Sequence, residues 1–119
     1  MIERRKFIRL SNTFTVGYRI LDSSEKEKIS FSKNISEGGI CFVVEEELGV
    51  SELLDLNLYL PGDKEVISVT GRVIWIKEFP EEGELGKRTF RVGIEFIGLD
   101  KKSAKKIDQY VRFALLDSG

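Results

Sequence analysis

The chain has 119 residues, 41% of them hydrophobic, which is enough for one compact domain with its own core and excludes a disordered protein. Its 19 basic and 20 acidic residues give a formal net charge of -1. This balance argues against a surface built as a whole for nucleic acid or for an anionic membrane, so any site for an anion must be local.

Six segments have the pattern of β-strands: most alternate apolar and polar residues, whereas residues 40–44 form a short apolar run that follows a loop. The last of them, residues 89–97, has the clearest alternation. The expected strands are residues 12–21, 28–33, 40–44, 54–60, 66–77 and 89–97. The residues expected to face the core are Phe14, Val16, Tyr18, Ile20, Leu54, Leu56, Leu58, Leu60, Phe90, Val92, Ile94 and Phe96.

Two of these strands have unusual features. In residues 28–33 the apolar side chains Ile29 and Phe31 share one face. In residues 66–77 the alternation places Trp75 on the same face as Val73, and Gly71 is predicted to mark a bend or a bulge. An indole on a strand is more often part of the barrel packing than a ligand platform, so Trp75 is not assigned to a site.

The C-terminal segment, residues 100–116, follows a helical period instead. Asp100 is placed to cap this helix, and its lysines fall on the solvent side. The apolar residues that recur at helical spacing are Ala104, Ile107, Tyr110, Val111, Ala114 and Leu115. Six strands followed by one helix favour an antiparallel barrel or sandwich over an alternating βαβ fold.

The residues for common enzyme chemistry are missing. The chain contains no histidine, which is the usual general base near neutral pH, and its acidic residues within 45–55 are interpreted as solvated surface. Cys41, the single cysteine, is expected to be a small core residue, and no zinc-like ligand set is present. We therefore predict no catalytic residue, no metal and no cofactor. No apolar segment is long enough for a membrane span, so a reducing, cytoplasmic setting is expected.

The N-terminal segment, residues 1–11, is the first candidate for ligand binding. It contains four basic residues and one acidic residue, Glu3, in a chain that is otherwise slightly acidic. The basic residues are Arg4, Arg5, Lys6 and Arg9. Guanidinium groups bind phosphate through two parallel hydrogen bonds and stack on purine rings, so arginines on such an arm could clamp a nucleotide. The alternative is a solvated basic tail.

The second candidate lies between two strands and reads Asn34-Ile35-Ser36-Glu37-Gly38-Gly39. The amide and the hydroxyl can form hydrogen bonds, and glycine lets a ligand approach the backbone closely. The alternative interpretation is an ordinary turn.

Together the two segments resemble the PilZ family, whose signature is an RxxxR stretch before the barrel and a [DN]xSxxG stretch further along. Here the first reads Arg5-Lys6-Phe7-Ile8-Arg9, and the second is the segment that begins at Asn34. Gly71-Arg72-Val73-Ile74-Trp75 and Val92-Gly93-Ile94-Glu95-Phe96 are also similar to the family. The resemblance covers essentially the whole chain. It implies an all-β fold, a six-stranded antiparallel β-barrel with one C-terminal α-helix, in a single domain with an arm (1–11), a barrel (12–98) and a helix (100–116).

The resemblance also implies a function, because the ligand of this family is the bacterial second messenger cyclic di-GMP. By similarity, Arg5 and Arg9 would bind phosphate and guanine, Asn34 and Ser36 would contact the other guanine, and Gly39 would keep the turn compact. The neutral Asn34 loses the charge-assisted acceptor that an aspartate would offer. The ligand would order the arm against the barrel, and the signal would pass to a separate partner protein or through a homo-oligomer.

Arg4 directly precedes the signature, and family members with arginine there suggest a further role. Cyclic di-GMP can self-associate into an intercalated dimer, for which Arg4 would supply an additional cationic donor. We therefore expect two ligand molecules per protomer. The alternative is that Arg4 faces water.

Three other readings remain open. The first is a PilZ-like adapter that binds proteins but no nucleotide, against which the intact signature residues argue. The second is a barrel for single-stranded nucleic acid, which needs a basic groove with exposed aromatic residues. The third is an enzyme, for which neither a base nor a metal site is found.

Overall fold

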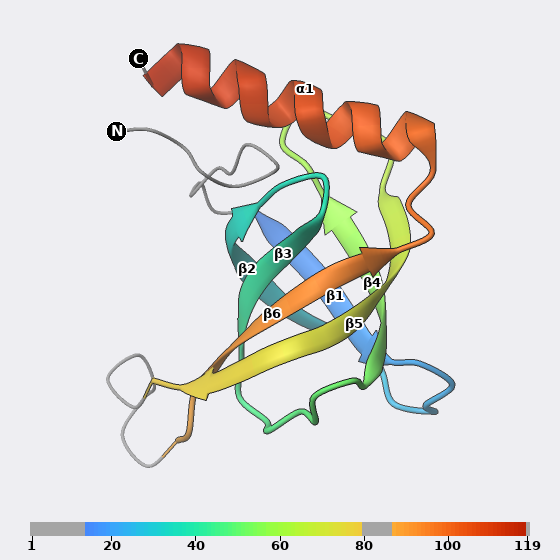
Figure 1. Cartoon of the computed structure of the whole chain (residues 1–119), viewed down its shortest axis with the longest axis vertical. Coiled ribbons are helices and arrows are strands. Elements are labelled where there is room, and N and C mark those ends of the chain that lie inside the picture. The colour runs from blue at the N-terminus through green and yellow to red at the C-terminus, as the bar shows by residue number, and fades with distance from the viewer. Residues whose placement is uncertain (1–13, 80–86, 119) are drawn as a thin grey trace.

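The computed structural model describes residues 14–79 and 87–118, with side chains as far as residue 113. Six strands precede one helix in this part of the chain, as the sequence predicts (Figure 1). The strands are β1 (Thr15–Ile20), β2 (Lys28–Ile35), β3 (Gly39–Val44), β4 (Leu53–Tyr59), β5 (Ile67–Glu78) and β6 (Phe90–Ile97), and the helix is α1 (Lys101–Ser118).

The strands close into an antiparallel barrel in the order β1-β2-β3-β6-β5-β4. The closing contact pairs β1 with β4 along six residues, from Thr15 opposite Tyr59 to Ile20 opposite Leu54. Closure matters because it leaves no row of unpaired backbone groups on which another strand could add. The all-β barrel with a C-terminal helix, expected from the sequence, is confirmed.

The core fills the barrel and continues under the helix. On β4 the leucines Leu54, Leu56 and Leu58 are almost fully buried, which confirms the predicted alternation. The helix crosses one end of the barrel (Figure 1) and adds Ile107 and Val111 to the same core. Within the described residues, no helix combines the length and the apolar character that crossing a membrane requires.

The shared face of Ile29 and Phe31 turns out to be the outer one. Both residues are 57% exposed, whereas the serines that alternate with them, Ser30 and Ser32, point into the barrel and are buried. The serines are tolerated inside because each finds a backbone partner. Ser30 Oγ donates to the carbonyl oxygen of Val43, and Ser32 Oγ accepts the N–H of Phe14 at an N···O distance of 3.1 Å.

The bulge in β5 does not lie at Gly71, as the sequence predicts, but three residues further along the strand. The pairing of β5 with β6 shifts between Val73 and Trp75, because Ile74 is an extra residue on β5. An extra residue changes the phase of the alternation, so side chains beyond it move to the other face. Val73 is therefore buried, whereas Trp75 is 42% exposed on the outside of the barrel. The prediction that Trp75 packs on the same face as Val73 is wrong.

The helix begins where Asp100 predicts. Oδ1 of Asp100 accepts the N–H of Ser103 at 2.6 Å, and the carbonyl oxygen of Asp100 accepts the N–H of Ala104 at 2.9 Å. These bonds satisfy N–H groups that have no partner within a helix. The hydrogen bonds from Ser103 hold the pKa of Asp100 below its ordinary value.

We expect Asp100→Ala to lower the midpoint of thermal unfolding at neutral pH. Because the pKa of Asp100 is lowered in the folded state, its contribution is present above its ordinary pKa and is lost as the pH falls through the folded pKa. The difference between variant and parent should therefore shrink in acid. Asp100→Asn is the control, since asparagine caps as well as aspartate but does not titrate. Equal differences at neutral and acid pH would contradict this role.

Candidate ligand-binding site

The turn between β2 and β3 is tight and is bonded to β6. The N–H of Ser36 donates to the carbonyl oxygen of Gly39 at 3.0 Å, and Ser36 Oγ accepts the N–H of Gly38 at 3.2 Å. The carbonyl oxygen of Gly38 accepts the N–H of Phe96 at 3.0 Å. Serine suits this turn because its hydroxyl can bond to the backbone two residues on. Only 5% of Ser36 is exposed, so its hydroxyl first of all holds the shape of the turn.

Asn34 lies at the end of β2, just before this turn. A bulge between Ser32 and Asn34 shifts the pairing of β2, so that Asn34 stands opposite Cys41 of β3. Its neighbour Ile35 is buried in the core, which places the Asn34 side chain on the outer surface. Within the described residues its carboxamide forms no side-chain hydrogen bond, and it can therefore offer both donors and acceptors to a ligand.

A row of residues runs from Asn34 across four strands on the outside of the barrel. Asn34 is opposite Cys41, Cys41 is opposite Gly93 of β6, and Gly93 is opposite Trp75 of β5. Residues paired across neighbouring strands point to the same face of a sheet. Cys41 is buried, as predicted, but within this outer row.

Gly93 makes room for the indole of Trp75. A Cβ on Gly93 would overlap the ring atoms of Trp75, so the indole lies directly across the bare backbone of β6. Trp75 as a whole nevertheless stays 42% exposed. An aromatic side chain that lies against a sheet and remains partly exposed is a surface on which a nucleobase can stack.

Gly39 brings the turn close to the same surface. It is paired with Glu95 of β6, and a Cβ at position 39 would overlap the carbonyl oxygen of Ile94. Glu95 in turn is opposite Arg72 of β5, with 3.0 Å between Glu95 Oε1 and Arg72 Nη1. We call the outer surface formed by Asn34, Ser36, Gly39, Gly93 and Trp75 the motif face.

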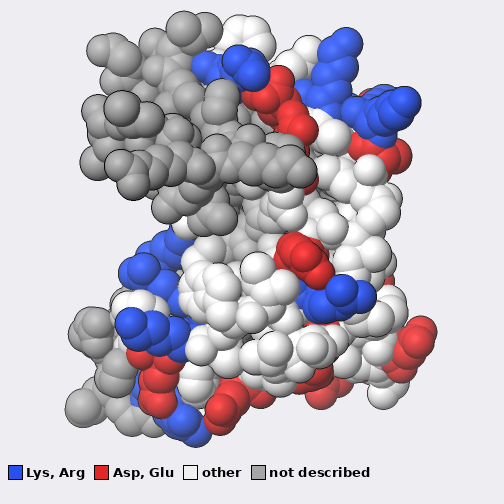
Figure 2. Space-filling view, viewed as in Figure 1, with Lys and Arg blue, Asp and Glu red and all other residues white. Residues whose placement is uncertain are grey.

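Basic side chains border the motif face. Lys77 and Arg91 are paired across β5 and β6, beside Trp75 and Gly93. Lys77 Nζ lies 5.3 Å, and the guanidinium carbon of Arg91 4.4 Å, from the ring centre of Phe79, so the aromatic ring positions both cations. Figure 2 views this side of the barrel and shows a largely uncharged area, with basic side chains and some acidic ones near the end of β5. This composition suits a ligand that combines flat rings with negative charge.

The most strongly shifted group in the described residues lies elsewhere. Burial, and then the carboxylates of Glu46 and Glu45, raise the pKa of Tyr18 above its usual range. Tyr18 is 4% exposed and its ring lies 5.2 Å from that of Phe42, so it is a core residue and not a catalytic acid. No group of three potential metal ligands converges in the described residues.

A family model of the PilZ domain matches residues 3–113 of the chain. The chain belongs to the PilZ domain family. No curated protein sequence is significantly similar to it.

Solved structures of PilZ proteins share the fold. The Bacillus subtilis inhibitor of motility (MotI/DgrA) is 22% identical with a TM-score of 0.78, and the match covers 98% of this chain and 53% of that one. The PilZ domain of YcgR from Escherichia coli, solved with c-di-GMP, is 17% identical with a TM-score of 0.71, covering 98% and 94%. The K. pneumonia MrkH-c-di-GMP complex is 15% identical with a TM-score of 0.77, covering 98% and 55%. The chain thus spans about half the length of MotI and MrkH.

The structure brings together the described part of the PilZ signature. Asn34, Ser36 and Gly39 all lie at the β2–β3 turn, although Asn34 belongs to β2 and Gly39 to β3 instead of to a loop. Arg4, Arg5 and Arg9 lie outside the described residues.

Trp75 lies in the motif face and Arg91 lies at its border. Neither residue was assigned to a site from the sequence. The signal that could have found Trp75 is Gly93, a glycine in the middle of an otherwise regular strand. Such a glycine often marks a place where another group lies against the backbone.

Proposed function

We propose that this PilZ domain is a receptor for cyclic di-GMP, which it binds on the motif face without converting it. The observation that carries the proposal is the placement of the signature turn and the exposed Trp75 on one outer surface. The structures of the YcgR PilZ domain and of MrkH with c-di-GMP, which share this fold, support the choice of ligand.

Each part of the face has a role in this proposal. The carboxamide of Asn34 reads the hydrogen-bonding edge of one guanine, and Trp75 offers its open ring for stacking. The guanidinium groups of Arg5 and Arg9, on the N-terminal arm, bind the phosphates and the second guanine. Arg91 adds a further positive charge at the border. Ser36 acts mainly by holding the turn.

The proposed output is a change of surface, not a reaction. Binding orders the arm against the barrel, and a partner protein or a second protomer recognises the result. Neither step needs a general base, which is consistent with a chain that contains no histidine.

Calorimetric titration of the purified chain with cyclic di-GMP, cyclic di-AMP, GTP and an oligonucleotide tests the proposal. We expect heat of binding with cyclic di-GMP alone, and ligand recovered unchanged after incubation. Absence of binding at saturating cyclic di-GMP would favour the rival function, a PilZ adapter that binds proteins but no nucleotide. Binding of the oligonucleotide instead would favour a nucleic-acid barrel.

Trp75 gives a separate prediction. Its replacement by alanine should weaken binding by about 1–3 kcal/mol, the usual contribution of one base stacked on an aromatic side chain. Because Trp75 is the only tryptophan of the chain, its fluorescence should also change on titration with ligand. Trp75→Phe, which keeps a ring, is the control and should retain most of the affinity. Unchanged affinity in Trp75→Ala would show that the indole only covers Gly93.

The number of ligands bound tests the role of Arg4. We expect two cyclic di-GMP molecules per protomer, and Arg4→Leu should shift the ratio toward one while Arg5 and Arg9 maintain binding. The reason is that an intercalated ligand dimer presents more phosphate and guanine edges than two arginines can match. Calorimetry with an independently measured active fraction of protein determines the ratio. A ratio of one in the parent chain would exclude this role for Arg4.

A further inference from the structure

A second outer surface of the barrel carries exposed apolar side chains that nothing in the described residues covers. On β2, Ile29 and Phe31 are each 57% exposed, and Tyr59 of β4 is 36% exposed. Phe31 is opposite Thr15 of β1, and Thr15 is opposite Tyr59, so these side chains flank β1 on the same face. An exposed apolar patch with a polar border commonly marks a protein interface.

The centre of this surface is a carboxylate. Ile29 is opposite Gly17 of β1, and Gly17 is opposite Asn57 of β4. A Cβ on Gly17 would overlap the carboxylate of Glu27, so this carboxylate lies over β1 between Ile29 and Asn57. We call the surface formed by Gly17, Glu27, Ile29, Phe31 and Tyr59 the β1–β4 face.

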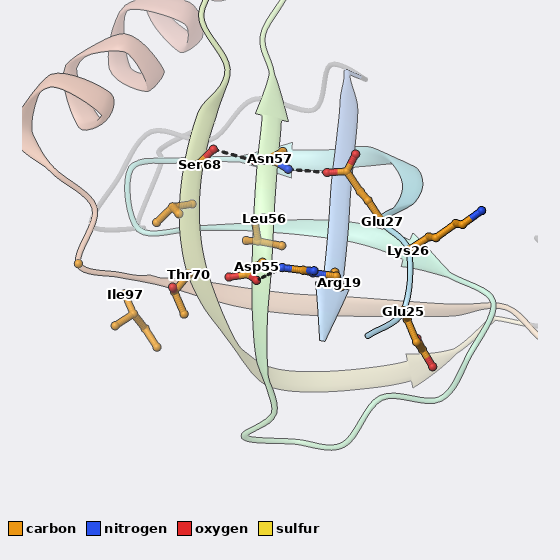
Figure 3. A pocket seen from close by; sticks show the side chains of 12 residues that line it. Arg19, Glu25, Lys26, Glu27, Asp55, Leu56, Asn57, Ser68, Thr70 and Ile97 are labelled. Carbon is orange, nitrogen blue, oxygen red and sulfur yellow. Dashed lines mark hydrogen bonds and ion pairs between the residues drawn. The ribbon is translucent and has the colours of Figure 1, made fainter. Parts of the chain in front are cut away.

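Neutral donors hold Glu27 in place. Oε1 of Glu27 accepts a hydrogen bond from the carboxamide of Asn57, and Oε2 accepts one from Tyr59 Oη at 3.3 Å. Asn57 is itself fixed by Ser68 Oγ, which donates to its Oδ1 at 2.7 Å. Figure 3 shows this chain of side chains across β5, β4 and β1, with Lys26 extending away from Glu27.

Glu27 and the neighbouring carboxylate of Asp55 have partners of different charge. Asp55, which lines the same groove of about 670 Å³, is paired with Arg19 at 2.9 Å. In the described part of the chain no lysine or arginine pairs with Glu27. Among the described residues the face therefore presents a positioned carboxylate without a cationic partner, beside an isoleucine and two aromatic rings.

We propose that the β1–β4 face binds a partner protein that presents an arginine or lysine side chain flanked by apolar residues. A cation fits here because it gains a charge-assisted hydrogen bond from Glu27 and can stack on Tyr59 or Phe31. Apolar neighbours on the partner would cover Ile29 and Phe31, and shielding from water strengthens the ion pair. Arginine surrounded by apolar contacts is also common among the residues that dominate interface energies.

This face and the motif face are centred on different sides of the barrel, although β2 contributes residues to both. In the closed barrel β1 stands opposite β6, and β4 stands opposite β3. Figure 1 shows the same arrangement, with β3, β6 and β5 toward the viewer and β1 behind them. Because Glu27 lies over β1, on the side of the barrel away from β6, we expect Glu27→Gln to leave binding of cyclic di-GMP unchanged.

The probe for the test is a library of random peptides displayed on phage and selected on the full chain. Enriched peptides are then synthesised and titrated against purified variants. We expect the enriched peptides to share a basic residue next to apolar ones. In Glu27→Gln the amide oxygen can still accept from Asn57, and the amide N–H can donate to Tyr59 Oη in place of the present bond. This variant should weaken peptide binding by about tenfold or more, the effect of losing one charge-assisted bond. Phe31→Ser should weaken it to a similar degree.

Matched controls keep the outcome specific. Glu25→Gln removes a carboxylate two positions away in the same loop, and Phe113→Ser removes a phenylalanine that is 67% exposed on α1. Both should bind the peptides as the parent does. Enrichment of acidic or purely apolar peptides, or unchanged binding by Glu27→Gln, would overturn the proposal. Sedimentation showing a homodimer that Phe31→Ser dissociates would overturn it too, because the face would then be occupied by a second copy of the chain.

Discussion

Replacing both Arg5 and Arg9 by alanine is expected to abolish measurable binding of cyclic di-GMP while the barrel stays folded. Each arginine can form charge-assisted hydrogen bonds to the ligand, and the loss of such bonds costs about 1.5–3 kcal/mol per residue. Both residues precede β1 and lie outside the described residues, so the fold of each variant is checked separately. Titration calorimetry measures the affinity, and circular dichroism reports the fold.

The control for this prediction lies between the two arginines. Lys6→Ala removes one positive charge from the same arm but leaves the signature intact, so it should reduce the affinity much less than Arg5→Ala or Arg9→Ala. If all three single variants weaken binding equally, the arm acts only through its net charge. If none does, the arm is a solvated tail and the motif face must bind its ligand without it.

Much of the barrel could be predicted from the sequence because burial follows the strand period of two. On β4 and β6, Leu56, Leu58, Val92 and Ile94 alternate with outward residues and are all buried, as expected. The helix was equally predictable, since Asp100 caps it and Ile107 faces the core. In these elements local pattern and tertiary packing agree.

The errors arose where the tertiary structure overrides the pattern. One extra residue on β5 turned Trp75 outward, and nothing near Ile74 in the sequence marks it as the bulge. On β2 the sequence placed Ile29 and Phe31 on one face but did not predict which face is inner. Ser30 and Ser32 face inward because they find backbone partners on other segments. Such partners depend on the register between strands, which one sequence does not reveal.

In the candidate site, too, the residues that are close in sequence could be predicted and the contacts between distant strands could not. Asn34, Ser36 and Gly39 could be selected because they are close together in the sequence and resemble a known signature. The row that joins Asn34 to Trp75 could not, because it depends on three strand pairings between residues far apart in the chain. The site residues in the signature were therefore predictable, whereas the surface on which they lie required the structure.

Gly39→Ala is expected to destabilise the domain by about 1–3 kcal/mol, the usual effect of forcing extra volume into a packed site. The added Cβ would overlap the carbonyl oxygen of Ile94, and a backbone atom cannot move away as a flexible side chain can. Separation of β3 from β6 should also loosen the bond from Phe96 to Gly38, and so weaken binding of cyclic di-GMP on the motif face. Urea unfolding and calorimetry measure the two effects.

Gly49→Ala is the control, because its Cβ would meet the side chain of Glu52, at 3.1 Å, and the free energy of unfolding should change little. Parent-like stability in Gly39→Ala would mean that β6 can shift without disturbing the turn, and Gly39 would then have no part in keeping the site compact.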